Sequence, residues 1–83
     1  MYYIYIIQNE VKEFYTGYTS NLEKRLTAHN AGENQSTKNH IWKLVYYEAY
    51  VSESYAHKRE LDLKKNRRMS SFFMKRIKES LSY

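Results

Sequence analysis

The chain has 83 residues and a net charge of +5, and it contains ten tyrosines but no cysteine. This length accommodates one small domain, expected over residues 1–83, and the lack of cysteine excludes disulfides and thiolate metal sites. No apolar run approaches the roughly 18 residues of a membrane span, and no signal-peptide pattern follows Met1. We therefore expect a cytoplasmic protein with no membrane association.

The first two predicted elements are strands. Residues 2–8 (YYIYIIQ) alternate Tyr and Ile, and residues 14–19 (FYTGYT) are a second run of strand-forming residues. The link between them is short and polar, which is typical of an antiparallel hairpin. Pairing of Tyr5 near Tyr15 would leave a loop of about three residues around positions 9–11.

A helix is predicted over residues 21–31, because Ser20 and Glu23 form an S-x-x-E capping box and Gly32 is a typical C-terminal stop. The next segment, ENQSTKNH, has no apolar period and indicates a loop. The following run, WKLVYYEAYV, carries large residues on both faces. That pattern favours the central strand of the sheet.

Two further helices complete the chain. The segment SESYAHKRELDLKKNRR begins with Ser and Glu and ends with basic residues, an order that suits the helix dipole. The segment SSFFMKRIKESL forms the last helix, in which apolar residues recur every fourth position: Met69, Phe73, Ile77 and Leu81. The predicted fold is α+β, a three-stranded antiparallel sheet flanked by helices in the order β-β-α-β-α-α.

Polar side chains fall on the inner faces of two predicted helices. On a helical wheel, His29 lies between Leu22 and Leu26, and Arg25 lies on their flank. A buried histidine with satisfied hydrogen bonds beside an arginine that extends to solvent would explain this pair without any function.

The predicted helix after the third strand places Glu60 between Ala56 and Leu63 on its inner face. An ionised carboxylate facing a core is costly unless a cation or a metal satisfies it. A buried salt bridge to Arg25 or Lys64 and a metal-ligand role are equally compatible with this position.

Together these groups suit a phosphodiester. Arginine binds phosphate through paired hydrogen bonds, a lone carboxylate can hold a largely hydrated Mg²⁺, and a phenol can orient or deprotonate an attacking water. Other chemistries lack their motifs, because the chain has no G-x-S-x-G elbow, no glycine-rich nucleotide loop and no histidines at zinc-site spacing.

Positive charge gathers in the C-terminal third, where nine Lys or Arg residues between Lys58 and Lys78 face two acids, Glu60 and Asp62. This bias favours a polyanion such as nucleic acid, although a solvated helix face would have the same composition. The candidate nucleic-acid-binding residues are Lys24, Lys38, Lys64, Lys65, Arg67, Arg68 and Lys75.

Four motifs in this order resemble the GIY-YIG endonuclease domain. The two signature tripeptides read YIY at residues 3–5 and YTG at residues 15–17, and they are followed by YTSNLEKRLTAHNAG and HKRELDLKK. The resemblance covers nearly the whole chain and is closest to small single-domain members. Tyr3 and Thr16 depart from the signature but replace no proposed catalytic group.

The resemblance implies a role for each matching residue. Tyr15 would be the general base or would position the water, and Tyr5 would support it by hydrogen bonding. Arg25 would stabilise charge on the phosphate, and His29 would contact phosphate or assist proton transfer. Glu60 would hold one divalent metal, Mg²⁺ or Mn²⁺.

Four other residues are weaker candidates. Gly17 would allow close approach of the backbone or Arg25, or would simply lie at a strand end. Glu48 would support the site or form a surface pair across strands, and Lys38 would contact phosphate or remain solvated. Lys75 would act where the family carries a distal Asn, or would be an exposed helix lysine.

The resemblance implies a metal-dependent DNA endonuclease, with structured, damaged and single-stranded DNA as the candidate substrates. One alternative is a nucleic-acid-binding module with weak or no catalysis, and another is an interaction domain whose polar groups are structural. A domain this small would gain specificity from a protein partner rather than from its own surface, and we expect a monomer or a weak dimer.

Overall fold

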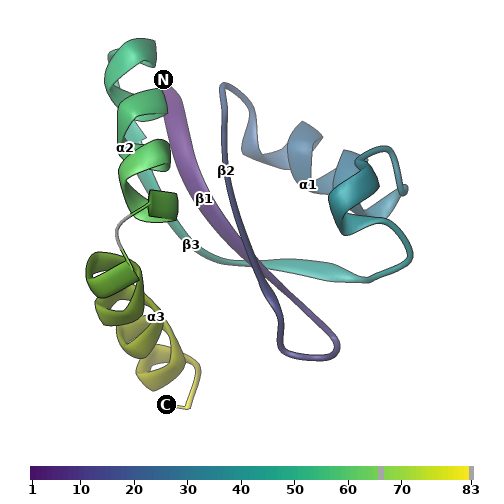
Figure 1. Cartoon of the computed structure of the whole chain (residues 1–83). Helices are drawn as coiled ribbons and strands as arrows, with labels where there is room; N and C mark the ends of the chain where they lie inside the picture. Colours follow the sequence, from purple (N-terminus) through teal and green to yellow (C-terminus); the bar gives the residue numbers. More distant parts are fainter. Residues whose placement is uncertain (66, 83) are drawn as a thin grey trace.

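A computed structural model describes residues 1–65 and 67–82, leaving out the side chains of residues 67–70 and 73. It confirms the predicted α+β fold and the order β-β-α-β-α-α, with one additional 3-10 turn. The sheet lies between α2 and α3 on one side and α1 and η1 on the other (Figure 1). The elements are β1 (Tyr2–Asn9), β2 (Phe14–Thr19), α1 (Leu22–Asn30), η1 (Gln35–Thr37), β3 (Trp42–Tyr50), α2 (Glu53–Lys65) and α3 (Arg67–Leu81).

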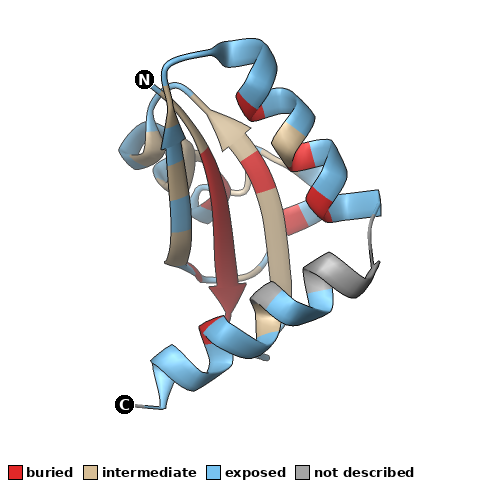
Figure 2. Ribbon diagram, turned by 90° about the vertical axis from the view of Figure 1, so that its left-hand side faces the viewer, coloured by how far each residue is buried: buried red, intermediate tan, exposed pale blue. Residues whose placement is uncertain are grey.

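The central strand is β1, so the prediction that residues 42–51 form the central strand is wrong. The sheet order is β2-β1-β3, with both pairings antiparallel. The IYII run at residues 4–7 is almost fully buried, and β1 forms the continuous buried strand in Figure 2. Large residues on β3 do not require burial on both faces, since Tyr47 remains 54% exposed at this sheet edge.

The hairpin register also differs from the prediction. Tyr5 lies opposite Gly17, and Tyr15 lies opposite Ile7. Four residues rather than three connect the strands, because Asn9 closes the turn through its side chain. Its Oδ1 accepts hydrogen bonds from the backbone N–H groups of Val11 (3.1 Å) and Glu13 (2.9 Å).

Helix α1 is capped by Asn21 and not by Ser20 as predicted. Asn21 has an extended backbone, and its Oδ1 accepts a hydrogen bond from the N–H of Lys24 at 3.0 Å. This is the usual N-cap geometry, in which a side-chain oxygen satisfies a free N–H of the first turn. The predicted stop is confirmed, since Gly32 follows the helix with a φ of +77°, a conformation that glycine adopts without steric cost.

The core is divided between the two faces of the sheet. Under α2, Ile4 packs against Ala56 and Leu63. Under α1, Tyr5, Ile7 and Trp42 form a second cluster, with Leu22 and Leu26 partly buried against it. On α3, Ile77 is buried and Leu81 is exposed; the side chains of Met69 and Phe73 lie outside the described residues.

A partly buried ion pair attaches α2 to β3. Arg59 donates from Nε (2.9 Å) and Nη2 (3.2 Å) to the two carboxylate oxygens of Glu48, which also accept hydrogen bonds from the hydroxyls of Tyr46 and Tyr50. Burial raises the pKa of Glu48, but these hydrogen bonds together hold that pKa below its usual value. Glu48 therefore bonds to α2 rather than forming a surface cross-strand pair, and this pairing orients the helix that carries Glu60.

Candidate active site

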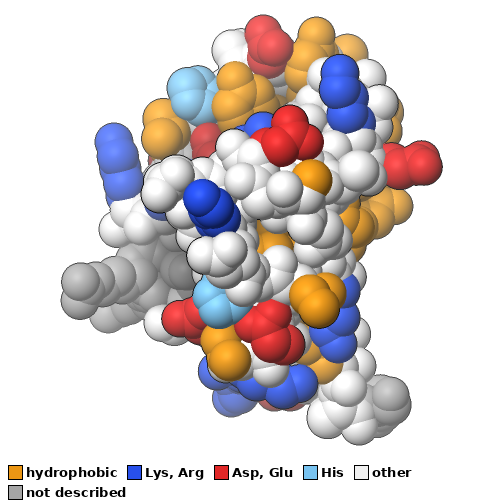
Figure 3. Space-filling view, turned by 90° about the vertical axis from the view of Figure 1, so that its right-hand side faces the viewer, with side chains coloured by type: hydrophobic (Ala, Val, Ile, Leu, Met, Phe, Trp, Pro, Cys, Tyr) orange, Lys and Arg blue, Asp and Glu red, His pale blue; other side chains and the backbone are white. Residues whose placement is uncertain are grey.

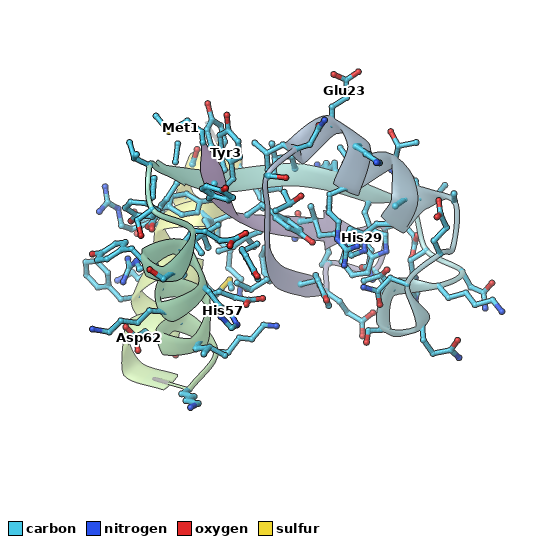
Figure 4. The ribbon with its side chains drawn as sticks, turned by 90° about the horizontal axis from the view of Figure 1, so that it is seen from above. Met1, Tyr3, Glu23, His29, His57 and Asp62 are labelled. Atoms are coloured by element: carbon cyan, nitrogen blue, oxygen red, sulfur yellow. The ribbon has the colours of Figure 1, made fainter. Side chains whose placement is uncertain are left out.

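A chain of buried hydrogen bonds connects the sheet to α1 and to the loop after it. The Tyr5 hydroxyl lies 2.7 Å from His29 Nε2, and His29 Nδ1 lies 2.7 Å from Thr37 Oγ1. All three residues are at most 2% exposed. Figure 4 shows His29 between α1 and the sheet, on the opposite side of the sheet from His57 of α2.

The hydrogen-bond partners of Tyr5 and Thr37 show which atoms of these three residues carry the protons. Arg25 donates from Nε to the Tyr5 oxygen at 3.3 Å, so the Tyr5 hydrogen is directed to His29 Nε2. At the other end, the Thr37 hydroxyl donates to the carbonyl of Asn34 at 3.4 Å and therefore accepts from His29 Nδ1. His29 is thus a neutral imidazole protonated on Nδ1, whose tautomer is fixed by its two hydrogen-bond partners.

The pKa shifts agree with this proton assignment. Burial, followed by the charge of Arg25, lowers the pKa of His29 below 6.5. Burial raises the pKa of Tyr5 despite the opposing effect of Arg25. The hydrogen bond to Tyr5 raises the pKa of Arg25, with a further contribution from Tyr15. At neutral pH Tyr5 is therefore a neutral phenol, His29 a neutral imidazole and Arg25 a charged guanidinium.

Gly17 allows the Tyr5 side chain to take this position. A Cβ at residue 17 would lie 2.9 Å or less from three atoms of the Tyr5 phenol, a separation that non-bonded atoms do not tolerate. The close approach is made by the Tyr5 ring rather than by the backbone or Arg25, and Gly17 lies within β2 rather than at its end.

Tyr15 lies on the same face of the sheet but is only partly buried. Its ring packs edge-on to the His29 ring with centroids 5.0 Å apart, and its hydroxyl accepts a long hydrogen bond of 3.5 Å from Asn34 Nδ2. The Nζ of Lys64 lies 5.6 Å from the centroid of the Tyr15 ring. Tyr15 is therefore the phenol of the site that solvent reaches, and the cations of Arg25 and Lys64 lie beside it.

Glu60 projects from the buried face of α2, as the sequence predicted. It is 8% exposed, and its carboxylate pairs with Lys64 at 3.1 Å. Of the two predicted salt-bridge partners, Lys64 and not Arg25 makes the bond. Because Lys64 also lies over Tyr15, this lysine connects the carboxylate of α2 with the phenol of β2.

The donor set around Glu60 fits a hydrated divalent metal. Among the described residues, no group of three or more His, Asp or Glu side chains is arranged to hold a metal ion. Mg²⁺ commonly takes one or two carboxylates and keeps several waters. The single carboxylate of Glu60, beside the half-exposed Lys64, is compatible with this mode of Mg²⁺ binding. Glu60 is the residue that would hold the ion.

The other predicted basic residues do not gather at this cluster. Lys24, Lys38, Lys65 and Lys75 are exposed on separate elements, while the side chains of Arg67 and Arg68 lie outside the described residues. Figure 3 shows that acidic and basic side chains are interspersed on the face carrying α1 and η1. The predicted positive bias lies between Lys58 and Lys78, on α2 and α3 and not on this face, so it stays a prediction.

Two residues of the site were not predicted from the sequence. Thr37 and Asn34 lie in the segment interpreted as a featureless loop, yet they hold His29 and Tyr15. The Asn34 side chain also accepts from the N–H of Ser36 at 2.9 Å, and the Thr37 carbonyl accepts from Trp42 Nε1 at 2.8 Å. The Asn-x-Ser spacing, typical of a side-chain turn, was the available signal for an ordered segment.

Comparisons with known proteins agree with this arrangement. The model of the GIY-YIG catalytic domain matches residues 1–78. A UPF0213 protein of Clostridium perfringens is 38% identical over 84 residues, covering 95% of this chain and 90% of that protein. A UPF0213 protein of Staphylococcus haemolyticus is 39% identical over 66 residues, covering 76% of this chain and 79% of that protein.

A solved structure has the same fold. The solution NMR structure of a UPF0213 protein from Bacillus halodurans is 26% identical, with a TM-score of 0.56 over 90% of this chain and 84% of that one. In the described part of the chain, no helix is both long and apolar enough to cross a membrane. The matched domain and the ordered motifs at Tyr5, Tyr15, Arg25, His29 and Glu60 show that the chain belongs to the GIY-YIG family.

Proposed function

We propose that this protein hydrolyses phosphodiester bonds of DNA at the cluster formed by Tyr15, Arg25 and Glu60. The proposal is supported by two contacts of the buried Tyr5–His29 pair and by Lys64. Tyr15 packs on the His29 ring and Arg25 donates to the Tyr5 oxygen, while Lys64 pairs with Glu60 and lies over the Tyr15 ring. Membership of a nuclease family supports the same reaction. Metal dependence and the form of the DNA belong to the proposal.

In this reaction a water oxygen attacks phosphorus, and the bond from phosphorus to one ester oxygen breaks. Tyr15 is the phenol that solvent reaches, so it is assigned to orient the water and, in its phenolate form, to take the proton of the water and become a neutral phenol. Arg25 is held at its Nε by Tyr5 and binds the non-bridging phosphate oxygens, whose charge rises in the transition state. The leaving oxygen takes a proton from solvent.

His29 and Tyr5 act through Arg25 rather than on the phosphate. Both nitrogens of His29 are hydrogen-bonded and the residue is 1% exposed, so it is assigned to orient the Tyr5 hydroxyl instead of contacting the substrate. Tyr5 in turn fixes the guanidinium. The resemblance implied that Tyr5 supports Tyr15 by hydrogen bonding. In this assignment Tyr5 supports Arg25 instead.

A divalent metal at Glu60, when bound, would supply charge to stabilise the phosphate. Glu60 would exchange its bond to Lys64 for the ion, and Lys64 would then be released toward the substrate beside Tyr15. A basic residue within reach of the phosphate adds a salt-dependent contribution to binding. Lys64 is thus the most direct candidate for a nucleic-acid contact among the described lysines.

The test is cleavage of end-labelled single-stranded, duplex, nicked and branched DNA, and of RNA, with Mg²⁺, with Mn²⁺ and with chelator. We expect metal-dependent cutting of at least one DNA form. Tyr15→Phe should reduce the rate by about 100-fold or more, the usual contribution of a general base. Tyr18→Phe is the matched control, because Tyr18 is a partly buried tyrosine of the same strand that stacks on His57 instead.

The alternative is a nucleic-acid-binding module that does not cut. The ion pair of Lys64 with Glu60 favours it, because a stable internal cation at the carboxylate would exclude the metal. Under this alternative every DNA form is bound but none is cut at any metal concentration. Binding that weakens steeply with salt, together with intact substrate, would therefore reject the nuclease assignment in favour of the module.

A further inference from the structure

Two tyrosines form an exposed aromatic pair beside the candidate active site. The rings of Tyr3 and Tyr47 meet edge to face with centroids 6.0 Å apart. Tyr47 is 54% exposed and Tyr3 is partly buried. A tyrosine ring that leaves most of its surface in water contributes little to the core, so core packing does not explain this residue.

The sheet register places this pair directly next to the buried hydrogen-bond chain. Tyr47 on β3 lies opposite Tyr5 on β1, and Tyr3 precedes Tyr5 by two residues, so all three side chains stand on the same face of the sheet. Side chains directly opposite each other across antiparallel strands are neighbours. The aromatic pair therefore lies next to the buried Tyr5 on the same face of the sheet.

Helix α1 covers only part of this face. It lies over the cluster of Tyr5, Ile7 and Trp42. In Figure 4 Tyr3 lies near the start of β1, on the side of the sheet away from α2 and beyond the end that α1 covers. The residues paired with Tyr3 across the sheet are small, Thr19 on β2 and Ala49 on β3. The two rings therefore stand above a low, open surface.

We propose that Tyr3 and Tyr47 are a stacking surface for an unpaired base of the nucleic-acid substrate. This inference rests on the proposed function and specifies its substrate class. A nucleic acid is favoured because Tyr47 lies opposite Tyr5, which accepts a hydrogen bond from Arg25, and because the chain has a net charge of +5. Exposed aromatic side chains on a sheet bind bases in this way, because every base has a π-face.

The consequence is a preference for strands whose bases are not paired. In a duplex the base faces are stacked on each other and are not available to Tyr47. A single strand, a flap or a frayed end offers a free base while its phosphates reach the Arg25 side of the face. Stacking also contributes no counterion release, so it should add affinity without changing the salt dependence.

The experiment measures fluorescence anisotropy of a labelled single-stranded oligodeoxynucleotide and of the matching duplex, with wild-type protein in chelator so that nothing is cut. We expect Tyr47→Ala to weaken single-strand binding about 5- to 150-fold, the range that corresponds to ~1–3 kcal/mol of stacking per base. The slope of affinity against salt should not change. Tyr47→Phe should bind as the wild type does, and Tyr3→Ala should act in the same direction as Tyr47→Ala.

Tyr55→Ala is the matched control, because Tyr55 is 53% exposed and lies on α2. The proposal is overturned if Tyr47→Ala changes single-strand binding no more than Tyr55→Ala does, or weakens duplex binding equally. It is also overturned if sedimentation shows a dimer that Tyr47→Ala dissociates, because a second copy would then cover the pair. If stacking is found but no DNA is ever cut, the proposed hydrolysis fails while this inference stands.

Discussion

Replacing Thr37 with valine tests the hydrogen-bond chain that holds the site. Valine has nearly the shape of threonine, so the packing around this fully buried residue is retained. The substitution removes the oxygen that lies 2.7 Å from His29 Nδ1. A buried N–H without a partner costs about 1–3 kcal/mol, and for a domain of this size each kcal/mol lowers Tm by about 4–8 °C.

His29 can avoid an unpaired Nδ1–H only by moving its proton to Nε2. That nitrogen would then donate to Tyr5, which already accepts from Arg25, and the Tyr5 hydrogen would lose its partner. The change of tautomer thereby disturbs the hydrogen bonding that holds the guanidinium, whereas an unpaired Nδ1–H costs stability alone. We therefore expect Thr37→Val to slow DNA cleavage by about 5- to 150-fold, the factor that corresponds to ~1–3 kcal/mol, if the loss is expressed in the transition state.

Thermal unfolding followed by circular dichroism measures the stability, and ¹⁵N NMR of the imidazole reports the tautomer. The wild type should show His29 protonated on Nδ1. Thr27→Val is the matched control, because Thr27 is an exposed threonine of α1 whose hydroxyl bonds the carbonyl of Glu23 within the helix. An unchanged Tm together with an Nδ1–H imidazole in Thr37→Val would refute the reasoning.

Three other perturbations give distinct readouts. Gly17→Ala should displace the Tyr5 ring and reduce both cleavage and stability, by about 1–3 kcal/mol as for overpacking; Gly32→Ala, strained at φ +77°, should lower stability alone. Because burial lowers the pKa of His29, the unfolded chain binds the extra proton first as the pH falls below 6.5. Unfolding free energy should therefore decrease from pH 6.5 down through the lowered pKa, and less so in His29→Gln; an equal decrease in both would contradict the assignment. Lys64→Gln removes the cation paired with Glu60 and should tighten Mn²⁺ binding in calorimetry, whereas unchanged or weaker binding would count against a metal at Glu60.

The sequence was sufficient for the fold class because its periodicities are local. The strand-forming runs at residues 2–8 and 14–19 and the position of Gly32 depend only on neighbouring residues, and the structure has both strands and the helix stop as predicted. The inward position of Glu60 was likewise predicted from helical spacing. The strand order was not predicted correctly, because a run of strand-forming residues with large side chains on both faces also suits an edge strand. In β3 the large side chain of Tyr47 remains exposed.

The contacts within the site depend on tertiary structure that local patterns do not contain. The approach of Tyr5 to Gly17 follows from a register set by the Asn9 turn, and no local pattern indicates a four-residue loop. Thr37 meets His29 only because η1 folds back under α1. A threonine in a polar segment has no apolar period, so burial of this residue could not be predicted from spacing.

The central claim is that Tyr15 and Glu60 hydrolyse DNA at one site, and nicking of supercoiled plasmid in a single turnover tests it most directly. We predict Mn²⁺- or Mg²⁺-dependent nicking by the wild type. Glu60→Gln and Tyr15→Phe should remain folded and nick about 100-fold or more slowly, whereas Glu33→Gln, at an exposed position, should nick at the wild-type rate. Nicking that persists at the wild-type rate in Glu60→Gln, or that needs no metal, would contradict the account.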